Sequence, residues 1–285
     1  MAILITGGHG FIGTNLVQKL INDNHEIVLF LREPYQNCNL PYILYNGDID
    51  FLIKSFLKYN ISGIIHLASY FVVNHSIADI DKIINANILL GTRLAEAAIH
   101  SNCKWFINTS TFWQYFNNKS YSPVSLYAAS KQALEDILKF YRDCYALKIT
   151  SLELFDTYGP GDKRIKLFAL LKKHSENSET LQMSPGEQKI NLLHVNDVVN
   201  AYQILINMME SPCKIRSNYS VFSNQSLSLK DVVTIYSRIS GKVINVEWGG
   251  KSYRPREIMD PKPLHGLVPS WVQEVSLEQG IQTII

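Results

Sequence analysis

A tyrosine and a lysine four residues apart, Tyr127 and Lys131, are the side chains of this chain that are best suited to proton transfer. On a helix, residues at this spacing lie on the same face. A phenol beside a fixed cation can give or take a proton near neutral pH, because the cation stabilises the phenolate. The spacing alone is a weak signal, since solvated Tyr–Lys pairs occur on many helices. Its meaning depends on the elements that position the pair.

The N-terminus has the pattern of a dinucleotide-binding turn. An apolar run at residues 2–5 leads into a glycine-rich turn and then into an amphipathic stretch at residues 11–22. In this context, Gly7 permits the tight turn, Gly10 lets the backbone approach a diphosphate, and Gly13 lets the helix pack closely on the strand. Free N–H groups at the helix N-terminus then attract the diphosphate. We expect the cofactor contacts here to be Gly7, Gly10, Phe11, Ile12 and Gly13.

The next strand, at residues 25–31, ends at Arg32, near the position where a dinucleotide site usually carries an acidic residue for the adenosine ribose. An arginine there can pair with a 2′-phosphate, which favours NADP over NAD. The alternative stays open that Arg32 is solvated and that Glu33 takes the ribose of NAD. Asp48 follows a third strand at residues 42–45, and its carboxylate could accept a hydrogen bond from the adenine amino group.

A fourth strand, at residues 63–69, closes on small residues that leave room for a cofactor. We expect Ile49, Leu67 and Ala68 to line the cofactor site and Ser69 to face the substrate. His66 is interpreted as a hydrogen-bonded histidine of the strand end rather than as a catalyst.

Strands and helices alternate from residue 2 to about residue 155, which predicts an α/β fold with a doubly wound parallel sheet of the Rossmann type. Residues 1–157 form the expected dinucleotide-binding domain. Residues 158–285 form mostly a smaller α/β substrate-binding lobe, with some segments returning to the first domain. The other expected elements are a helix at 77–101, a strand at 105–109, a helix from 127 to 146, a strand at 149–154, a loop at 175–178 and a helix at 195–209.

Composition excludes several classes of function. The chain has 285 residues, is 46% hydrophobic and carries a formal charge of +2, without a basic run interleaved with aromatic residues, so we expect no nucleic-acid partner. No apolar run is long enough for a signal peptide or a membrane span, so we expect no membrane association and a cytoplasmic location. Four scattered cysteines indicate no metal site and no disulfide framework, but reduced and mostly buried thiols: Cys38, Cys103, Cys144 and Cys213.

Taken together, the motifs resemble the extended short-chain dehydrogenase/reductases, in the branch that acts on nucleotide sugars. The resemblance covers nearly the whole chain. It rests on the glycine turn, Thr111, Tyr127 with Lys131, Tyr158-Gly159-Pro160, Gly186-Glu187-Gln188, Val195-Asn196-Asp197, Trp271 and Ser276-Leu277-Glu278-Gln279-Gly280.

The resemblance implies a role for each of three catalytic residues. Tyr127 would protonate a carbonyl oxygen of the substrate, and Thr111 would donate a hydrogen bond to the same oxygen. Lys131 would hold the nicotinamide ribose and lower the pKa of the phenol.

The residues after Thr111 separate the reactions of this branch. Dehydratases of the branch that this chain resembles place an Asp and a Glu directly after the hydroxyl residue. Enzymes of the branch that epimerise C3 and C5 place a Cys at the second of these two positions. This chain has Phe112 and Trp113, which cannot transfer protons. Reduction of a ketone remains, or epimerisation by oxidation and re-reduction. The two aromatic side chains could form a wall against an apolar sugar face, or they could simply pack in the core.

Two positions depart from the resemblance. An arginine that commonly grips the nucleotide diphosphate corresponds to Ile190, and an asparagine before Tyr-Gly-Pro corresponds to Asp156, which we still place in the substrate site. Arg254 and Arg256 could bind the diphosphate instead, or they could be two surface arginines near a turn.

The leading hypothesis is an NADPH-dependent reductase of a nucleotide-linked 4-keto-6-deoxyhexose, supplying a deoxysugar for surface polysaccharide such as the O-antigen of lipopolysaccharide. An NAD-dependent nucleotide-sugar epimerase is the alternative enzyme. A non-catalytic dinucleotide-binding regulator is the alternative of another class, and the intact set of Thr111, Tyr127 and Lys131 argues against it. By analogy with the branch, we expect a homodimer formed through the helices at 77–101 and 127–146.

Overall fold

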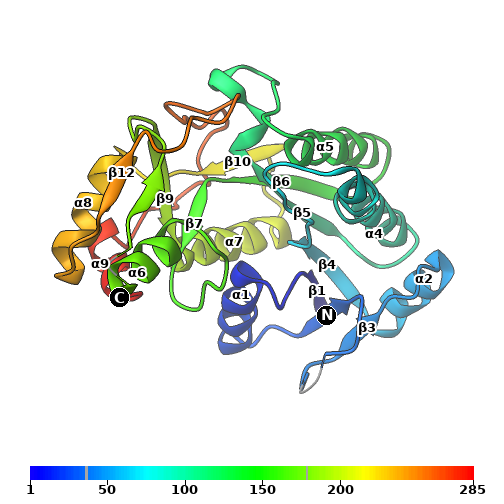
Figure 1. Cartoon of the computed structure of the whole chain (residues 1–285). Helices are drawn as coiled ribbons and strands as arrows, with labels where there is room; N and C mark the ends of the chain where they lie inside the picture. The colour runs from blue at the N-terminus through cyan, green and yellow to red at the C-terminus, as the bar shows by residue number, and fades with distance from the viewer. Residues whose placement is uncertain (36–37, 178) are drawn as a thin grey trace.

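A computed structural model describes residues 1–35, 38–177 and 179–285. These residues contain a seven-stranded parallel sheet in the order β10-β6-β5-β4-β1-β2-β3 (Figure 1). The strand order reverses between β1 and β4, which is where a doubly wound sheet opens a ligand crevice at the carboxyl ends of its strands. The predicted fold class is confirmed. The strands are β1 (Ala2–Thr6), β2 (Ile27–Leu31), β3 (Tyr42–Leu44), β4 (Ile61–His66), β5 (Trp105–Thr111), β6 (Lys148–Leu154) and β10 (Asn218–Val221).

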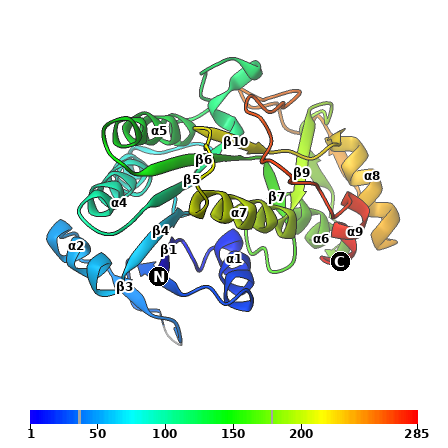
Figure 2. The ribbon, with the colours of Figure 1, turned by 180° about the vertical axis from the view of Figure 1, so that it is seen from behind.

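Helices cover both faces of this sheet, as the two opposite views show (Figures 1 and 2). One face packs against α2 (Ile49–Lys58), α4 (Leu90–Ile99) and α5 (Leu126–Cys144), and the other against α1 (Phe11–Asn22) and α7 (Val195–Glu210). The inner strands are therefore buried on both sides, which explains why β1, β2 and β4 read as continuous apolar runs. None of the helices in the described ranges is long and apolar enough to span a membrane.

The predicted helix at residues 77–101 is helical, but it is not one regular α-helix. It consists of η1 (Ile77–Asp79), α3 (Ile80–Ile84), a π-helical segment η2 (Asn85–Leu89) and then α4. A π segment shifts the direction in which its side chains point and often occurs at functional sites. Here it places the side chain of Asn87 in the interior, with no exposed surface.

Three short strands, β7 (Asp156–Tyr158), β9 (Lys189–His194) and β11 (Ser226–Ser228), form a second sheet, and β8 (Leu181–Met183) pairs with β12 (Val246–Trp248). A separate apolar core joins these strands to α6 (Leu167–Asn177), α8 (Leu229–Ser240) and α9 (Leu277–Gln282). The loop predicted at residues 175–178 is wrong for 175–177, which form the last turn of α6, and residue 178 lies outside the described residues. The division into two domains at residue 157 stays a prediction.

The cysteines differ from the expectation in their burial. Cys103 is buried, and burial raises the pKa of its thiol to about 12. Cys144 and Cys213 are exposed, so the prediction of mostly buried thiols is wrong. Both exposed cysteines lie in polar segments, at the end of α5 and just after α7.

Candidate active site

The glycine-rich turn between β1 and α1 has the geometry of a diphosphate cradle. Gly7 has a φ of 68°, and a Cβ there would lie 2.8 Å from the backbone nitrogen of Ala68. A Cβ on Gly13 would lie 2.1 Å from the carbonyl oxygen of Gly7, so only glycine lets α1 approach β1 this closely. Gly10 caps α1 without a side-chain hydrogen bond, which leaves the first N–H groups of the helix free for an anion. The packing roles predicted for Gly7 and Gly13 are confirmed, and the turn fits a dinucleotide.

Polar and aromatic side chains lie around the predicted adenosine site. Arg32 directly follows β2, is exposed and forms no hydrogen bond or ion pair with any residue that the structure describes. His9, inside the glycine turn, stacks on Tyr35 with ring centroids 3.7 Å apart. Asp48 accepts a hydrogen bond of 2.9 Å from the backbone nitrogen of Asp50 and thereby caps α2. Its contact with adenine stays a prediction.

Thr6 at the end of β1 organises the neighbouring end of β4. Its Oγ1 accepts a 3.0 Å hydrogen bond from the nitrogen of Ala68 and lies 2.8 Å from Nδ1 of His66, while its carbonyl accepts from the nitrogen of Leu67. Burial holds the pKa of His66 at about 3, so its ring is neutral. The interpretation of His66 as a strand-end histidine is confirmed, although its Nε2 has no partner within the described ranges. Ile49 begins α2 and packs against the apolar core.

Helix α5 presents Tyr127 and Lys131 together, as the spacing predicted. Ser125 caps the helix by accepting a hydrogen bond from the nitrogen of Ala128, which places Tyr127 in the first turn. The ammonium nitrogen of Lys131 lies 6.0 Å from the centre of the Tyr127 ring. Lys131 is only 1% exposed, and burial lowers its pKa to about 8.

Burial raises the pKa of Tyr127 to about 12, and a hydrogen bond with Ser69 offsets only part of this effect. The lowering of this pKa by Lys131 stays a prediction, because burial and the Ser69 hydrogen bond are the causes that act on the phenol in this structure. Tyr127 is consequently a neutral acid at physiological pH.

Asn87 of the π segment holds the surroundings of Tyr127 in place. Its Nδ2 donates to Oγ of Ser130 at 2.9 Å, and Ser130 in turn donates to the carbonyl oxygen of Tyr127 at 2.7 Å. Its Oδ1 accepts from the hydroxyl of Ser69 and from the nitrogen of Tyr70. Asn87 thus satisfies backbone groups of the turn after β4, because its Nδ2 also donates to the carbonyl oxygen of Tyr70. Ser69 contacts Asn87 and Tyr127, and its role toward the substrate stays a prediction.

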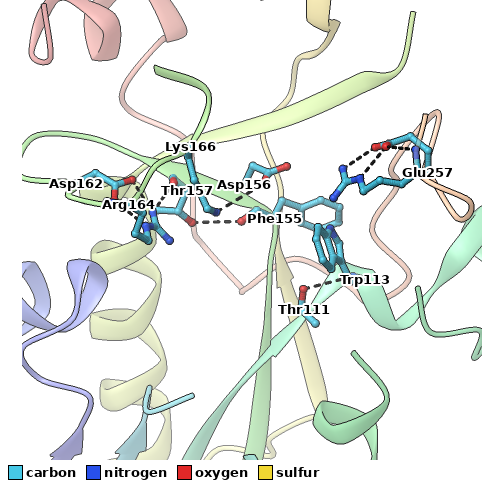
Figure 3. Close-up of polar contacts among 10 residues, drawn as sticks. Thr111, Trp113, Phe155, Asp156, Thr157, Asp162, Arg164, Lys166 and Glu257 are labelled. Atoms are coloured by element: carbon cyan, nitrogen blue, oxygen red, sulfur yellow. Dashed lines mark hydrogen bonds and ion pairs between the residues drawn. The ribbon is translucent and has the colours of Figure 1, made fainter. Parts of the chain in front are cut away.

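Thr111 is the last residue of β5 and begins the short helix η3 (Phe112–Gln114). Its Oγ1 accepts a 3.4 Å hydrogen bond from the nitrogen of Trp113 (Figure 3). Its own nitrogen donates to Oε1 of Gln114. The cap occupies a lone pair of the hydroxyl and leaves its O–H available to a substrate oxygen.

The two aromatic residues after Thr111 take different positions. Phe112 stacks on Phe155, with ring centroids 4.7 Å apart, and packs against the main core. Trp113 instead lies near Tyr127, with ring centroids 6.5 Å apart. Phe71, which sequence reasoning missed, packs edge-on to Tyr127 at 4.9 Å and lies 5.5 Å from Trp113. The core interpretation thus fits Phe112, and Trp113 and Phe71 form the apolar surroundings of the phenol.

Arg254 lies beside Trp113, and Arg256 lies over the ring of Phe116. Arg254 donates from Nε and Nη2 to the carboxylate of Glu257, at 2.8 and 2.7 Å, and its guanidinium lies 5.0 Å from the Trp113 ring. Arg256 donates to the hydroxyl of Ser122. Their contact with a diphosphate stays a prediction, and for Arg254 two donors are already engaged.

Two further cations lie in the loop after β7, and sequence reasoning missed both. Arg164 pairs with the carboxylate of Asp162 through Nε and Nη2, both at 2.7 Å, and its guanidinium lies 4.6 Å from the ring of Phe11 in the cofactor helix. Lys166 lies 3.8 Å from Oδ1 of Asp156 (Figure 3). The structure thus places Asp156 beside a cation at the edge of the site.

The structure shows a Rossmann-type fold whose glycine-rich turn fits a dinucleotide, with Tyr127 and Lys131 together on α5. The acid/base roles of Thr111, Tyr127 and Lys131 stay a prediction. The sequence profile of the NAD dependent epimerase/dehydratase family matches residues 3–217, and the chain belongs to this family.

Named relatives extend over the whole chain. CDP-abequose synthase of Salmonella muenchen is 28% identical over 289 residues, covering 99% of this chain and 96% of the relative. CDP-abequose synthase of Yersinia pseudotuberculosis is 25% identical over 269 residues, covering 92% of each. The structure of MoeE5 in complex with UDP-glucuronic acid and NAD superposes with a TM-score of 0.84 at 23% identity, over 99% of this chain and 97% of that chain, which shows a shared fold.

Proposed function

We propose that this enzyme reduces the 4-keto group of a nucleotide-linked 6-deoxy-4-ketohexose, with NADPH as the reductant. The names of the CDP-abequose synthases support a nucleotide-linked sugar as the substrate and make CDP the first nucleotide to test. The product would supply a deoxysugar for a surface polysaccharide, such as an O-antigen. The enzyme would act as a homodimer in the cytoplasm.

The observation that carries this proposal is a single neutral acid in apolar surroundings. Removal of water from a sugar needs its own acid and base beside Thr111, and the chain has only Phe112 and Trp113 there. Tyr127, with a pKa raised to about 12, holds a proton that a ketone oxygen can receive. Redox chemistry at one carbon is what this set of side chains supports.

The residues divide the work as follows. A bound nicotinamide dinucleotide supplies the hydride. Tyr127 gives its proton to the substrate oxygen, and the free O–H of Thr111 stabilises the charge that develops there. Lys131, whose ammonium forms no hydrogen bond within the described ranges, would bind the nicotinamide ribose. Asn87 and Ser130 fix the backbone of Tyr127.

A second candidate is an NAD-dependent nucleotide-sugar epimerase. It is favoured by the name of the family profile and by the NAD present in the structure of MoeE5. An epimerase must also take a proton from the sugar hydroxyl, and Tyr127 would be the base of that step. The exposed Arg32 directly after β2 favours the 2′-phosphate of NADP and thereby the reductase.

The test is to follow the absorbance of reduced nicotinamide while the protein meets NADPH or NADH and a panel of CDP-, GDP-, dTDP- and UDP-linked 4-keto-6-deoxy sugars. We expect rapid oxidation of NADPH with one member of the panel. The contrary result has three parts: no oxidation with any pair of cofactor and sugar nucleotide, NAD that stays bound through purification, and interconversion of two sugar nucleotides. This result would refute the reductase and support the epimerase.

A further inference from the structure

The face of the sheet that α5 covers changes from apolar to polar toward the carboxyl ends of its strands. Phe106 and Ile149 are paired on this face within the apolar core, and every second residue after them points the same way. These further positions, with one from the neighbouring strand β10, are buried and polar: Asn108, Ser110, Ser151, Glu153 and Ser220. Burying so many polar groups costs free energy, so we searched this polar layer for a role in the reaction.

Two carboxyl groups lie in the polar layer without an ion pair to a lysine or arginine in the described ranges. Glu153 has no exposed surface, and its Oε1 accepts a 2.8 Å hydrogen bond from Ser220. Glu135 of α5 accepts from Nε2 of Gln114 at 3.1 Å and from Nδ2 of Asn218 at 3.2 Å. Burial is the main cause that raises the pKa of each carboxyl, and the charge of Glu135 adds to the shift at Glu153. Such a pair retains a proton near neutral pH.

The inner end of the polar layer lies at the helix that carries the proposed acid. Glu135 follows Lys131 by four residues on α5, as Lys131 follows Tyr127, so the three side chains lie along one face of the helix. Burial lowers the pKa of Lys131 to about 8, and the charge of Glu135 opposes this shift. The protonation of Lys131 is therefore coupled to that of the carboxyl pair.

The outer end of the polar layer reaches the surface at His265, whose side chain is 25% exposed. Its Nε2 lies 3.9 Å from Oε2 of Glu153 and 3.0 Å from the hydroxyl of Tyr115. Both groups are neutral near pH 7, because burial raises the pKa of Tyr115 and lowers that of His265. Three buried atoms of the layer have no hydrogen-bond partner in the described ranges: Oδ1 of Asn108, Oγ of Ser110 and Oε2 of Glu153. Buried atoms of this kind usually bind internal water, and carboxyls, hydroxyls and water both donate and accept protons.

We propose that Glu135 and Glu153 form a proton path from solvent to Lys131 and Tyr127. The inference rests on the proposed function, in which each reduction consumes the proton of Tyr127. The Lys131 ammonium supplies a proton to the phenolate that remains, and the proton held by the two carboxyls passes to the Lys131 amine. Solvent at His265 returns a proton to the pair, so one proton enters for each ketone that is reduced.

The path is tested by comparing single-turnover and steady-state rates of the full-length protein, with NADPH and whichever sugar nucleotide of the CDP-, GDP-, dTDP- and UDP-linked panel it reduces fastest. In a single turnover Tyr127 already holds its proton, so Glu135→Gln and Glu153→Gln should keep nearly the wild-type rate. At low buffer concentration their kcat should fall about tenfold or more, since a positioned proton-transfer group usually contributes about 10²- to 10⁴-fold. Imidazole, a small acid that can donate from solvent, should restore kcat. Asp136→Asn is the matched control, because this exposed acid of α5 removes a charge outside the polar layer.

A kcat of both glutamine variants equal to that of Asp136→Asn would overturn the path. So would an equal loss in single and multiple turnovers that imidazole does not restore, because a purely structural role lowers both rates alike. These results leave the reductase intact, since the wild type still oxidises NADPH. A wild type that oxidises NADPH with no member of the panel would instead refute the reductase, and with it the demand for a proton that the path meets. Thermal unfolding of each variant shows whether a loss of rate reflects a loss of fold.

Discussion

At the scale of single residues, the proposed reduction depends on the proton of Tyr127. The phenol has a pKa raised to about 12 because it is desolvated among apolar neighbours. Tyr127→Phe removes the acid while keeping the ring that packs on Phe71 and Trp113. We expect kcat to fall about 10²- to 10⁴-fold, the usual contribution of a general acid, with the Kd of NADPH nearly unchanged. Stopped-flow rates and fluorescence titration measure the two quantities, and a variant that keeps most of its rate would exclude Tyr127 from the mechanism.

We propose that the preference for the cofactor depends on Arg32. The exposed guanidinium directly follows β2 and has no acidic partner in the described ranges. Arg32→Asp should lower kcat/KM for NADPH by about tenfold or more, because it replaces a phosphate partner by a charge that repels the phosphate. The value for NADH should stay equal or rise. Equal use of both cofactors before and after the change would show that Arg32 does not bind the 2′-phosphate.

The sequence predicted some of these residues and missed others for a physical reason. Tyr127 and Lys131 lie one helical turn apart, so local geometry alone brings them together. Phe71 and Lys166 reach the same site from loops after β4 and β7, and no regular spacing links them to Tyr127. Only tertiary packing creates these contacts.

At the scale of elements, the sheet was predictable because its inner strands are short apolar runs between polar turns. The end of α6 was not predictable, because its last turn is polar and such a turn has the composition of a loop. The π segment around Asn87 was not predictable either, since the apolar spacing of residues 77–99 fits an ordinary helix.

Strand β6 carries an unusual buried acid, Glu153, between the sheet and α5. Its Oε1 accepts a 2.8 Å hydrogen bond from Ser220, and its Oε2 lies 3.9 Å from Nε2 of His265. Burial is the main cause that raises the pKa of Glu153 to about 8, above its ordinary 4.5, and the neighbouring Glu135 adds to the shift.

The folded protein therefore holds this proton more tightly than the unfolded chain, and the free energy of unfolding falls as the pH rises from about 4.5 to about 8. Because a glutamine does not titrate, Glu153→Gln should gain stability relative to the wild type between pH 6.5 and 8, by up to about 1.4 kcal/mol per pH unit. His265, whose pKa is lowered by burial, stays neutral throughout this range. Urea unfolding at several pH values measures the difference, and a constant difference would show that Glu153 titrates normally.

At the scale of the whole molecule, the site is assembled from distant parts of the chain. The segment after Thr111 is fixed by the C-terminal region, because Tyr115 bonds His265 at 3.0 Å and Asn118 bonds the backbone of both Asp260 and Lys262. Trp113, which lies between these contacts and Tyr127, therefore depends on residues nearly 150 positions later. Local sequence patterns do not predict such contacts between residues far apart in the chain.

An exposed apolar surface beside α4 and α5 bears on the oligomeric state. Helices α4 and α5 pack side by side on one face of the sheet (Figures 1 and 2), and apolar side chains remain exposed on this side, including Phe140 at 54% and Tyr145 at 44%. A two-fold axis through this face would bury the patch against its own copy.

We expect light scattering behind a sizing column to give twice the chain mass of 32.5 kDa for the wild type and a single chain mass for Phe140→Glu, because the new carboxylate would be buried without a partner. Phe51→Glu on α2 is the matched control, since Phe51 is an exposed phenylalanine of another helix. A wild type of single chain mass, or dissociation by both variants alike, would place any dimer elsewhere. Because Phe140 lies three turns beyond Tyr127 on α5, loss of the dimer should also loosen the helix that carries the acid and lower kcat in the same variant.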